Sequence, residues 1–258
     1  MIVAILPGAM SGHSKWSTIK RQKGANDAKR GALFTKVARE IAVAARAGGG
    51  DPDANYRLRL AIDKARSINM PADNIKRAIE RATGGGDAEQ YEEIVYEGYG
   101  PGGVAVLVEA ATDNRNRTAA EVRSIFTKTG GQLAGSGAVA WQFETRGLIT
   151  VPRDGSDPDE VALAAIDAGA VDVDTESDPI EIYTEPADLE AVRTALDTAG
   201  VNVDGAESAM LAKQTVSLEA DQVRKAMRMV DLLEDLDDVQ RVTTNVDIPE
   251  EVLAELAG

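Results

Sequence analysis

The sequence predicts an α+β protein of several domains, in which an N-terminal three-helix bundle precedes two α/β domains of the ferredoxin-like kind. The third domain is expected to be inserted in the second. The chain has 258 residues, enough for two or three domains with their own cores. Its first third carries apolar residues at helical spacing, whereas short strands alternate with helices after Gly86. The net charge changes sign at the same place.

Basic residues gather near the N-terminal end of the chain. Of the 28 Lys and Arg residues, 16 lie between Met10 and Ala82, where only 7 Asp and Glu accompany them. From Thr83 onward the chain holds 12 basic and 36 acidic residues. Such an asymmetry is typical of a basic module that contacts a polyanion and is joined to an acidic body that does not.

The composition excludes several classes of protein. No apolar run reaches 18 residues, so no membrane contact is predicted. The chain has no cysteine, which excludes disulfides and thiolate chemistry and fits a cytoplasmic protein. Residues 1–9 are apolar but lack the basic region of a signal peptide. We interpret them as an extension ahead of a second start at Met10.

An arm and three helices are predicted before residue 86. Residues 11–22 are polar and basic without helical spacing, which indicates an extended or poorly ordered arm. The first helix should begin near Asn26 and end at a run of glycines from Gly48. A second helix is expected at 53–68. A third opens with Pro71 in its first turn and ends in the glycines that follow Thr83.

Strands and helices of a second domain are predicted after residue 86. Residues 93–97 and 103–109 are expected to form strands joined by a Gly/Pro turn. A helix should run from 118 to about 128, with Thr118 and Glu121 as a reciprocal capping pair. Further elements of this domain are predicted as strands at 139–143, 213–218 and 239–246 and a helix at 219–236.

The segment between these parts has the order strand, helix, strand, strand, helix, strand, which is that of a ferredoxin-like domain. Its strands are predicted at 148–151, 170–174, 180–184 and 206–211, and its helices at 158–168 and 187–199. The sequence therefore predicts four parts. They are the extension 1–9, the basic arm and helical domain 10–86, a discontinuous α/β domain 87–145 plus 212–258, and the inserted ferredoxin-like domain 146–211.

The arm, the first helix and one loop supply candidate nucleic-acid-binding residues. Lys and Arg neutralise phosphates without reading sequence, and a tryptophan among them is suited to stack on a base. The loop at 112–118 fits equally a turn with a cap or a contact surface. The candidates are Lys15, Trp16, Lys20, Arg21, Lys23, Lys29, Arg30, Lys36, Arg39, Arg115 and Arg117. The alternative is a solvated basic tail with Trp16 packed against the bundle.

The remaining motifs favour structural roles, and we predict no catalytic residue, no metal and no cofactor. His13 is the only histidine, and without cysteines or suitably spaced carboxylates it lacks partners for a zinc site. The glycine-rich loop 98–103 lies between two strands, so a dinucleotide would find no helix N-terminus there. The acidic C-terminal half is interpreted as a solvated surface that repels nucleic acid or binds a protein partner.

Several long segments of the chain resemble the YebC family. They are GHSKWSTIKRQKGANDAKRGALFTKVAREI (12–41), MPADNIKRAIERATG (70–84), YEGYGPGGVAVLVEAATDNRNRT (96–118), VRSIFTKTGGQLAGSGAVAWQFETRG (122–147) and DLLEDLDDVQRVTTNVDI (231–248). These segments occur in the same order as in the family, and the resemblance spans nearly everything after Met10. The departures are mild: Gly31-Ala32 stands where a basic residue often follows the glycine, and Ala134 and Ala138 replace residues that are more often Gly and Ser.

The resemblance implies three domains, a cytoplasmic or mitochondrial location and no enzymatic activity. Family members are described as probable transcriptional regulatory proteins, and DNA binding is attributed to some. Others act on the ribosome and ease stalling on proline-rich stretches, or activate translation of a cytochrome oxidase subunit. We therefore predict a regulator that binds DNA, with a ribosome-associated factor that binds ribosomal RNA as the alternative. Phosphate contacts do not distinguish these targets, and no helix with obvious base-reading side chains stands out.

Overall fold

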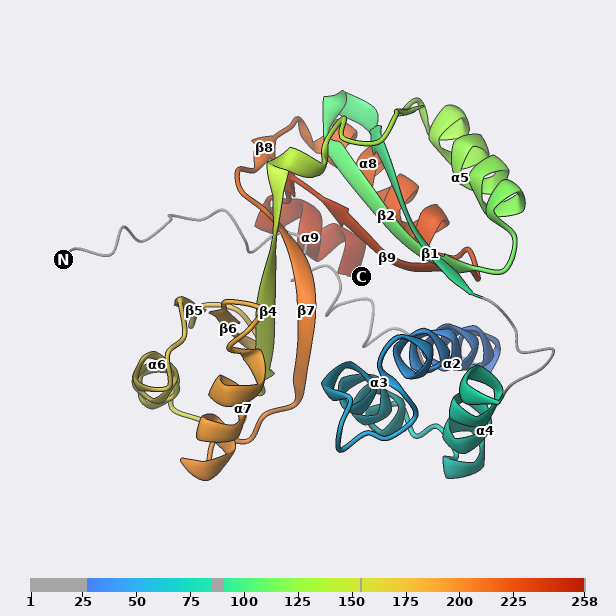
Figure 1. The fold of residues 1–258 in the computed structure, drawn as a ribbon. Helices are drawn as coiled ribbons and strands as arrows, with labels where there is room; N and C mark the ends of the chain where they lie inside the picture. Colours follow the sequence, from blue (N-terminus) through green and yellow to red (C-terminus); the bar gives the residue numbers. More distant parts are fainter. Residues whose placement is uncertain (1–26, 85–90, 154, 258) are drawn as a thin grey trace. The chain divides into compact units, whose positions relative to one another are not determined.

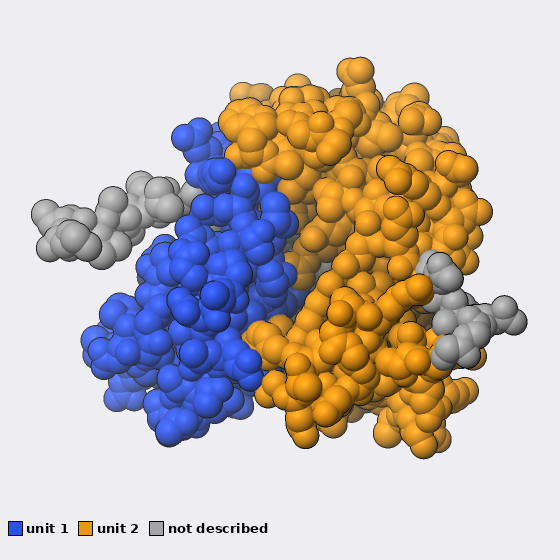
Figure 2. Space-filling view, viewed as in Figure 1, with its two compact units in different colours: residues 1–22, 142–217, 245–258 blue, residues 23–141, 218–244 orange. Residues whose placement is uncertain are grey.

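The structure is a computed structural model that describes residues 27–84, 91–153 and 155–257 (Figure 1). Its described residues form two compact units, which Figure 2 distinguishes by colour. The unit that comes first among the described residues, called the first unit below, is orange and labelled unit 2 in Figure 2, and it contains residues 27–84, 91–141 and 218–244. The second unit is blue and labelled unit 1 there, and it contains 142–153, 155–217 and 245–257. Among the described residues, no helix is long and apolar enough to cross a membrane.

Three helices form the bundle of the first unit, as predicted (Figure 1). They are α2 (Asp27–Gly48), α3 (Tyr56–Ser67) and α4 (Ala72–Thr83). Asn55 sets the start of α3, because its side chain accepts a hydrogen bond from the Leu58 amide at 3.1 Å. The same side chain donates to the carbonyls of Ala44 and Gly49, both at 2.8 Å, and so ties α3 to the end of α2. The three helices enclose an apolar core that includes Val37, Ile41, Leu58, Ile62, Met70 and Ile75.

The rest of the first unit is a four-stranded antiparallel sheet with two helices. Its elements are β1 (Glu92–Tyr99), the short 3-10 helix η1 (Pro101–Gly103), β2 (Ala105–Thr112), α5 (Arg115–Thr129), β3 (Gln132–Leu133), η2 (Ala140–Gln142), α8 (Ala220–Glu234) and β9 (Val239–Thr244). The strand order is β3-β1-β2-β9. Helices α5 and α8 contact each other, and each also contacts the sheet. The predicted hairpin turn between β1 and β2 is confirmed, with Gly102 at a positive φ of 76°.

The second unit contains the predicted ferredoxin-like arrangement. Its elements are β4 (Phe143–Val151), α6 (Pro158–Asp167), β5 (Asp172–Asp174), β6 (Ile180–Thr184), α7 (Leu189–Thr198) and β7 (Gly205–Ala212). All neighbouring strands are antiparallel, in the order β5-β6-β4-β7. The unit also contains a short parallel pair and a terminal helix, which are β8 (Val216–Ser217), β10 (Val246–Asp247) and α9 (Glu250–Ala257).

Two sequence predictions in the first unit are wrong. Helix α5 begins one turn before Thr118, because the Asn114 side chain caps it by accepting the Arg117 amide at 3.1 Å. Residues 139–143 do not form one strand. The buried Glu97 carboxylate accepts the amides of Val139 and Ala140, both at 2.8 Å, and so removes donors that a strand would need.

Other differences concern the length and number of the strands and helices. The strand predicted at 213–218 shrinks to the two residues of β8, and the one predicted at 239–246 divides into β9 and β10. The predictions did not include β3 or α9. β3 has only two residues and pairs with β1, and α9 has only eight, so local periodicity carries little sign of either element.

Candidate nucleic-acid interface

Five of the predicted interface residues, Lys15, Trp16, Lys20, Arg21 and Lys23, lie outside the described residues. Lys29 belongs to α2, but its side chain is not among those described. The structure describes the side chains of the other five candidates, which are Arg30, Lys36, Arg39, Arg115 and Arg117. We call internal the group that binds Asp238 or the backbone carbonyls at the end of α8, which is Lys36, Arg39 and Arg117, although the Arg117 side chain is itself 43% exposed. The exposed group is Arg30 and Arg115.

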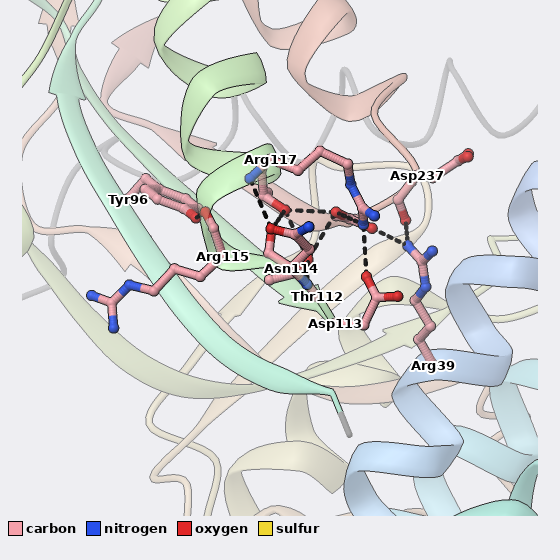
Figure 3. Close-up of polar contacts among 10 residues, drawn as sticks. Arg39, Tyr96, Thr112, Asp113, Asn114, Arg115, Arg117 and Asp237 are labelled. Carbon is pink, nitrogen blue, oxygen red and sulfur yellow. Dashed lines mark hydrogen bonds and ion pairs between the residues drawn. The ribbon is translucent and has the colours of Figure 1, made fainter. Parts of the chain in front are cut away.

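The internal group surrounds the carboxylate of Asp238, which lies just before β9. This carboxylate is only 3% exposed. One of its oxygens, Oδ2, accepts hydrogen bonds from Thr112 at 2.9 Å and Thr118 at 2.6 Å. Arg117 Nη2 also donates to Oδ2, at 2.6 Å, and Arg39 Nη1 lies 2.8 Å from Oδ1 (Figure 3). Asp238 therefore joins α2 of the bundle to β2, α5 and the start of β9.

The electrostatics of this cluster favour the charged forms of both partners. Burial by itself raises the pKa of Asp238, but hydrogen bonds from Thr118, Arg117 and Thr112 and the charge of Arg39 outweigh it. The pKa of Asp238 is therefore held below its usual value. Hydrogen bonds to Asp238 and Asp113 raise the pKa of Arg117, so its guanidinium stays charged.

Two basic side chains of α2 also bind the end of α8 and the turn after it. Lys36 Nζ donates to the carbonyl of Glu234, and Arg39 Nη1 donates to the carbonyl of Asp237. Positive charge at a helix C-terminus is favourable, because the last carbonyls of the helix are unpaired and carry partial negative charge. Two of the predicted phosphate-binding residues, Lys36 and Arg39, thus hold the bundle against the α/β part of the same unit, and a third, Arg117, binds Asp238 from within that part.

Arg30 and Arg115 form the exposed group. The Arg115 side chain is 67% exposed and lies 3.5 Å from Glu92. In Figure 3 it points away from the Asp238 cluster. The guanidinium carbon of Arg30 lies 5.5 Å from the centroid of the Phe34 ring, a cation–π distance. Both side chains are placed where a phosphate in solution can reach them.

Comparison with family models decides the family of the chain. Residues 14–85 match the model described as the TACO1/YebC protein N-terminal domain, and residues 91–246 match that of the TACO1/YebC second and third domain. The chain belongs to the TACO1/YebC family. Both matches lie after residue 9, and the first contains the whole three-helix bundle.

Relatives in the TACO1/YebC family are similar over nearly their full length. A probable transcriptional regulatory protein of Roseiflexus castenholzii is 58% identical over 248 residues, which is 94% of this chain and 97% of the relative. One of Rubrobacter xylanophilus is 56% identical over 250 residues, or 96% of this chain and all of the relative. The crystal structure of a conserved hypothetical protein of Aquifex aeolicus has a TM-score of 0.83 at 47% identity. That match covers 88% of this chain and 94% of the other.

The bundle of this TACO1/YebC chain also exposes basic side chains that sequence reasoning did not select. They are Arg46 on α2, Arg66 on α3, and Lys76, Arg77 and Arg81 on α4. The spacing of Arg77 and Arg81, one helical turn apart, is visible in the sequence and places them on one face. Among the described residues, no group of three or more acidic or histidine side chains could hold a metal ion.

Proposed function

We propose that this chain is a non-enzymatic regulator that binds DNA through its basic arm and helical bundle and controls transcription. The charge distribution is the observation that carries the proposal, because 16 basic residues meet only 7 acidic ones between Met10 and Ala82. Lys and Arg release counterions when they neutralise phosphates, which supplies affinity without sequence readout. The names of the relatives, probable transcriptional regulatory proteins, support the same role.

The internal contacts of the basic residues narrow the set that we propose for binding DNA. Lys36, Arg39 and Arg117 are engaged within the protein, so the phosphate contacts fall to the arm and to exposed side chains of the bundle. The arm residues Lys20, Arg21 and Lys23 are then the main electrostatic contacts. The acidic remainder of the chain repels nucleic acid and so confines it to the basic surface, or presents a face to a protein partner. The protein works in the cytoplasm and uses no cofactor.

Salt dependence tests this proposal. Affinity for a 20-base-pair DNA duplex should fall steeply as salt rises, and the triple change K20A/R21A/K23A should flatten the slope of log K against log salt. The reduction should be about 0.9 for each phosphate contact that is lost. A matched control with the same change in charge removes Arg153, Lys225 and Arg228, which are exposed side chains outside the basic module. Equal slopes for the two triple variants would refute the arm as the binding element.

A second experiment separates DNA from ribosomal RNA as the target. Cell lysate is sedimented through sucrose, and the fractions are probed for the protein. Under the proposal the protein stays out of the ribosomal fractions and protects defined promoter segments in footprinting. Sedimentation with ribosomes, without protection of promoters, would contradict transcriptional control and support the ribosome-associated alternative.

A further inference from the structure

Helices α2 and α4 border an open groove of about 370 Å³ on the bundle. Each helix lines it with one or two residues from each successive turn. On α2 these are Phe34, Thr35, Ala38, Arg39 and Ala42, and on α4 they are Asn74, Arg77, Ala78, Arg81 and Ala82. Met70 and Tyr91 complete the lining. The volume lies in the range of small-ligand sites, roughly 300–1,000 Å³.

The residues that line this groove are of several chemical kinds. Four of the twelve lining residues are alanines, two from each helix, and their small side chains leave room for an uncharged planar group. Two aromatic residues, Phe34 and Tyr91, and three arginines are also among the lining residues, together with Thr35, Met70 and Asn74. No acidic side chain is among the described lining residues. The groove thus combines aromatic faces with positive charge, as sites for single-stranded nucleic acid do.

The three arginines of the groove are held to different degrees. Arg39 is fixed by Asp238 and lies with its guanidinium carbon 5.5 Å from the Tyr91 ring centroid. Arg77 is oriented by hydrogen bonds to the Asp73 carbonyl at 3.1 Å and the Asn74 side chain at 2.7 Å. Arg81 is exposed and has no ion-pair partner within the described part of the chain. Arg77 and Arg81 therefore keep donors for an external anion.

We propose that this groove receives one unpaired nucleotide, with the base against the alanines of α2 and α4 beside Phe34 and Tyr91 and a neighbouring phosphate at Arg77 and Arg81. The site rests on the proposed function, since it adds a subsite for an unstacked base to a surface that binds nucleic acid. A duplex keeps its bases stacked and cannot fill the groove without extruding one. The groove therefore gives the protein a preference for single-stranded or bulged segments, which phosphate contacts alone do not supply.

The test measures binding of the full chain to three probes, which are the oligonucleotides r(A)12 and d(A)12 and a 12-base-pair duplex. Arg81→Ala should weaken binding of the single strands about 5-fold or more, whereas Lys76→Ala should change it less than about 2-fold. Lys76 is the matched control, because it is exposed on the same helix but does not line the groove. If r(A)12 and d(A)12 respond equally, the subsite takes either sugar; a response confined to one of them assigns the groove to that nucleic acid.

A second pair of variants changes the shape of the groove without changing its charge. Ala82→Leu adds volume at a lining position and should weaken single-strand binding about 5- to 150-fold, the range for loss of one stacked base. Ala72→Leu adds the same side chain at an exposed position of the same helix and should have no effect. Circular dichroism checks that both variants fold. A fluorescent 2-aminopurine in the single strand should be quenched on binding to the wild type, and less so on binding to Phe34→Leu.

The outcomes separate the subsite from the proposed function. Wild-type affinity for Arg81→Ala and Ala82→Leu would overturn the subsite while leaving nucleic-acid binding intact. An equal loss for single strands and duplex would also overturn it, because the groove would then contribute only charge or fold. Failure of the wild type to bind any of the three probes would overturn both proposals.

Discussion

Replacing Asp238 by Asn should destabilise the first unit more than any change at an exposed ion pair. The substitution preserves size but removes the charge that faces Arg39 and Arg117. The amide also turns one acceptor into a donor, at a site where one oxygen accepts from Thr112, Thr118 and Arg117 and the other faces Arg39. At least one buried donor therefore loses its acceptor, whichever way the amide is oriented.

The size of this destabilisation follows from the burial of the Asp238 carboxylate. Removing one partner of a buried, hydrogen-bonded ion pair costs about 3–5 kcal/mol, and because Asn retains one acceptor we expect about 2–4 kcal/mol. For a unit of this size, each kcal/mol shifts the melting temperature by about 2–4 °C. The melting temperature of the first unit should thus fall by about 4–16 °C.

The loss of stability in Asp238→Asn should also depend on pH. Because the pKa of Asp238 is lower in the folded protein than in the unfolded chain, its ionisation stabilises the fold at pH values above the unfolded pKa of about 3.9. This contribution is lost as the pH falls through the lowered folded pKa. The difference in unfolding free energy between wild type and Asp238→Asn should therefore be largest near neutral pH and shrink below about pH 4.

Urea unfolding followed by circular dichroism, at pH 7 and at pH 3, measures both effects. Asp113→Asn is the matched control, since it removes the exposed carboxylate that lies 2.8 Å from the same Arg117. That change should cost at most about 1 kcal/mol. Equal stability of the two variants at pH 7, or a difference between wild type and Asp238→Asn that grows on acidification, would refute the reasoning.

Two further changes test the α/β part of the first unit. Glu97→Gln should cost about 1–3 kcal/mol and accelerate amide hydrogen exchange at residues 137–140, because the buried carboxylate accepts three amides there and the variant keeps one oxygen. Glu121→Gln, at an exposed position of α5, should leave that exchange unchanged, and faster exchange in both variants would contradict the assignment. Gly130→Ala should lower the unfolding free energy by about 1 kcal/mol, since Gly130 ends α5 at a φ of 85°. Gly135→Ala, which adds a methyl into open space, is its control in urea titrations, and equal losses would disprove a conformational cause.

Much of the fold could be predicted because its signals are local. The bundle helices follow from apolar spacing and terminal glycines, and the order of the inserted domain follows from alternating short strands and helices. The start of α5 could not be placed in this way, because Asn114 and Thr118 are both good caps one turn apart. Asn114 is the cap because the Thr118 side chain is engaged elsewhere: it is buried and donates to Asp238, 120 positions later in the chain.

The sequence by itself determined the division of charge between a basic N-terminal module and an acidic remainder, since a count of charges needs no coordinates. Only the tertiary structure decided what each basic side chain does. Lys36 and Arg39 share a helix with Arg30, yet the packing of α2 against the end of α8 gives them internal acceptors and leaves Arg30 exposed. The groove between α2 and α4 arises in the same way. Side chains on separate helices meet only when packing brings the helices together, and the spacing within either helix does not specify that contact.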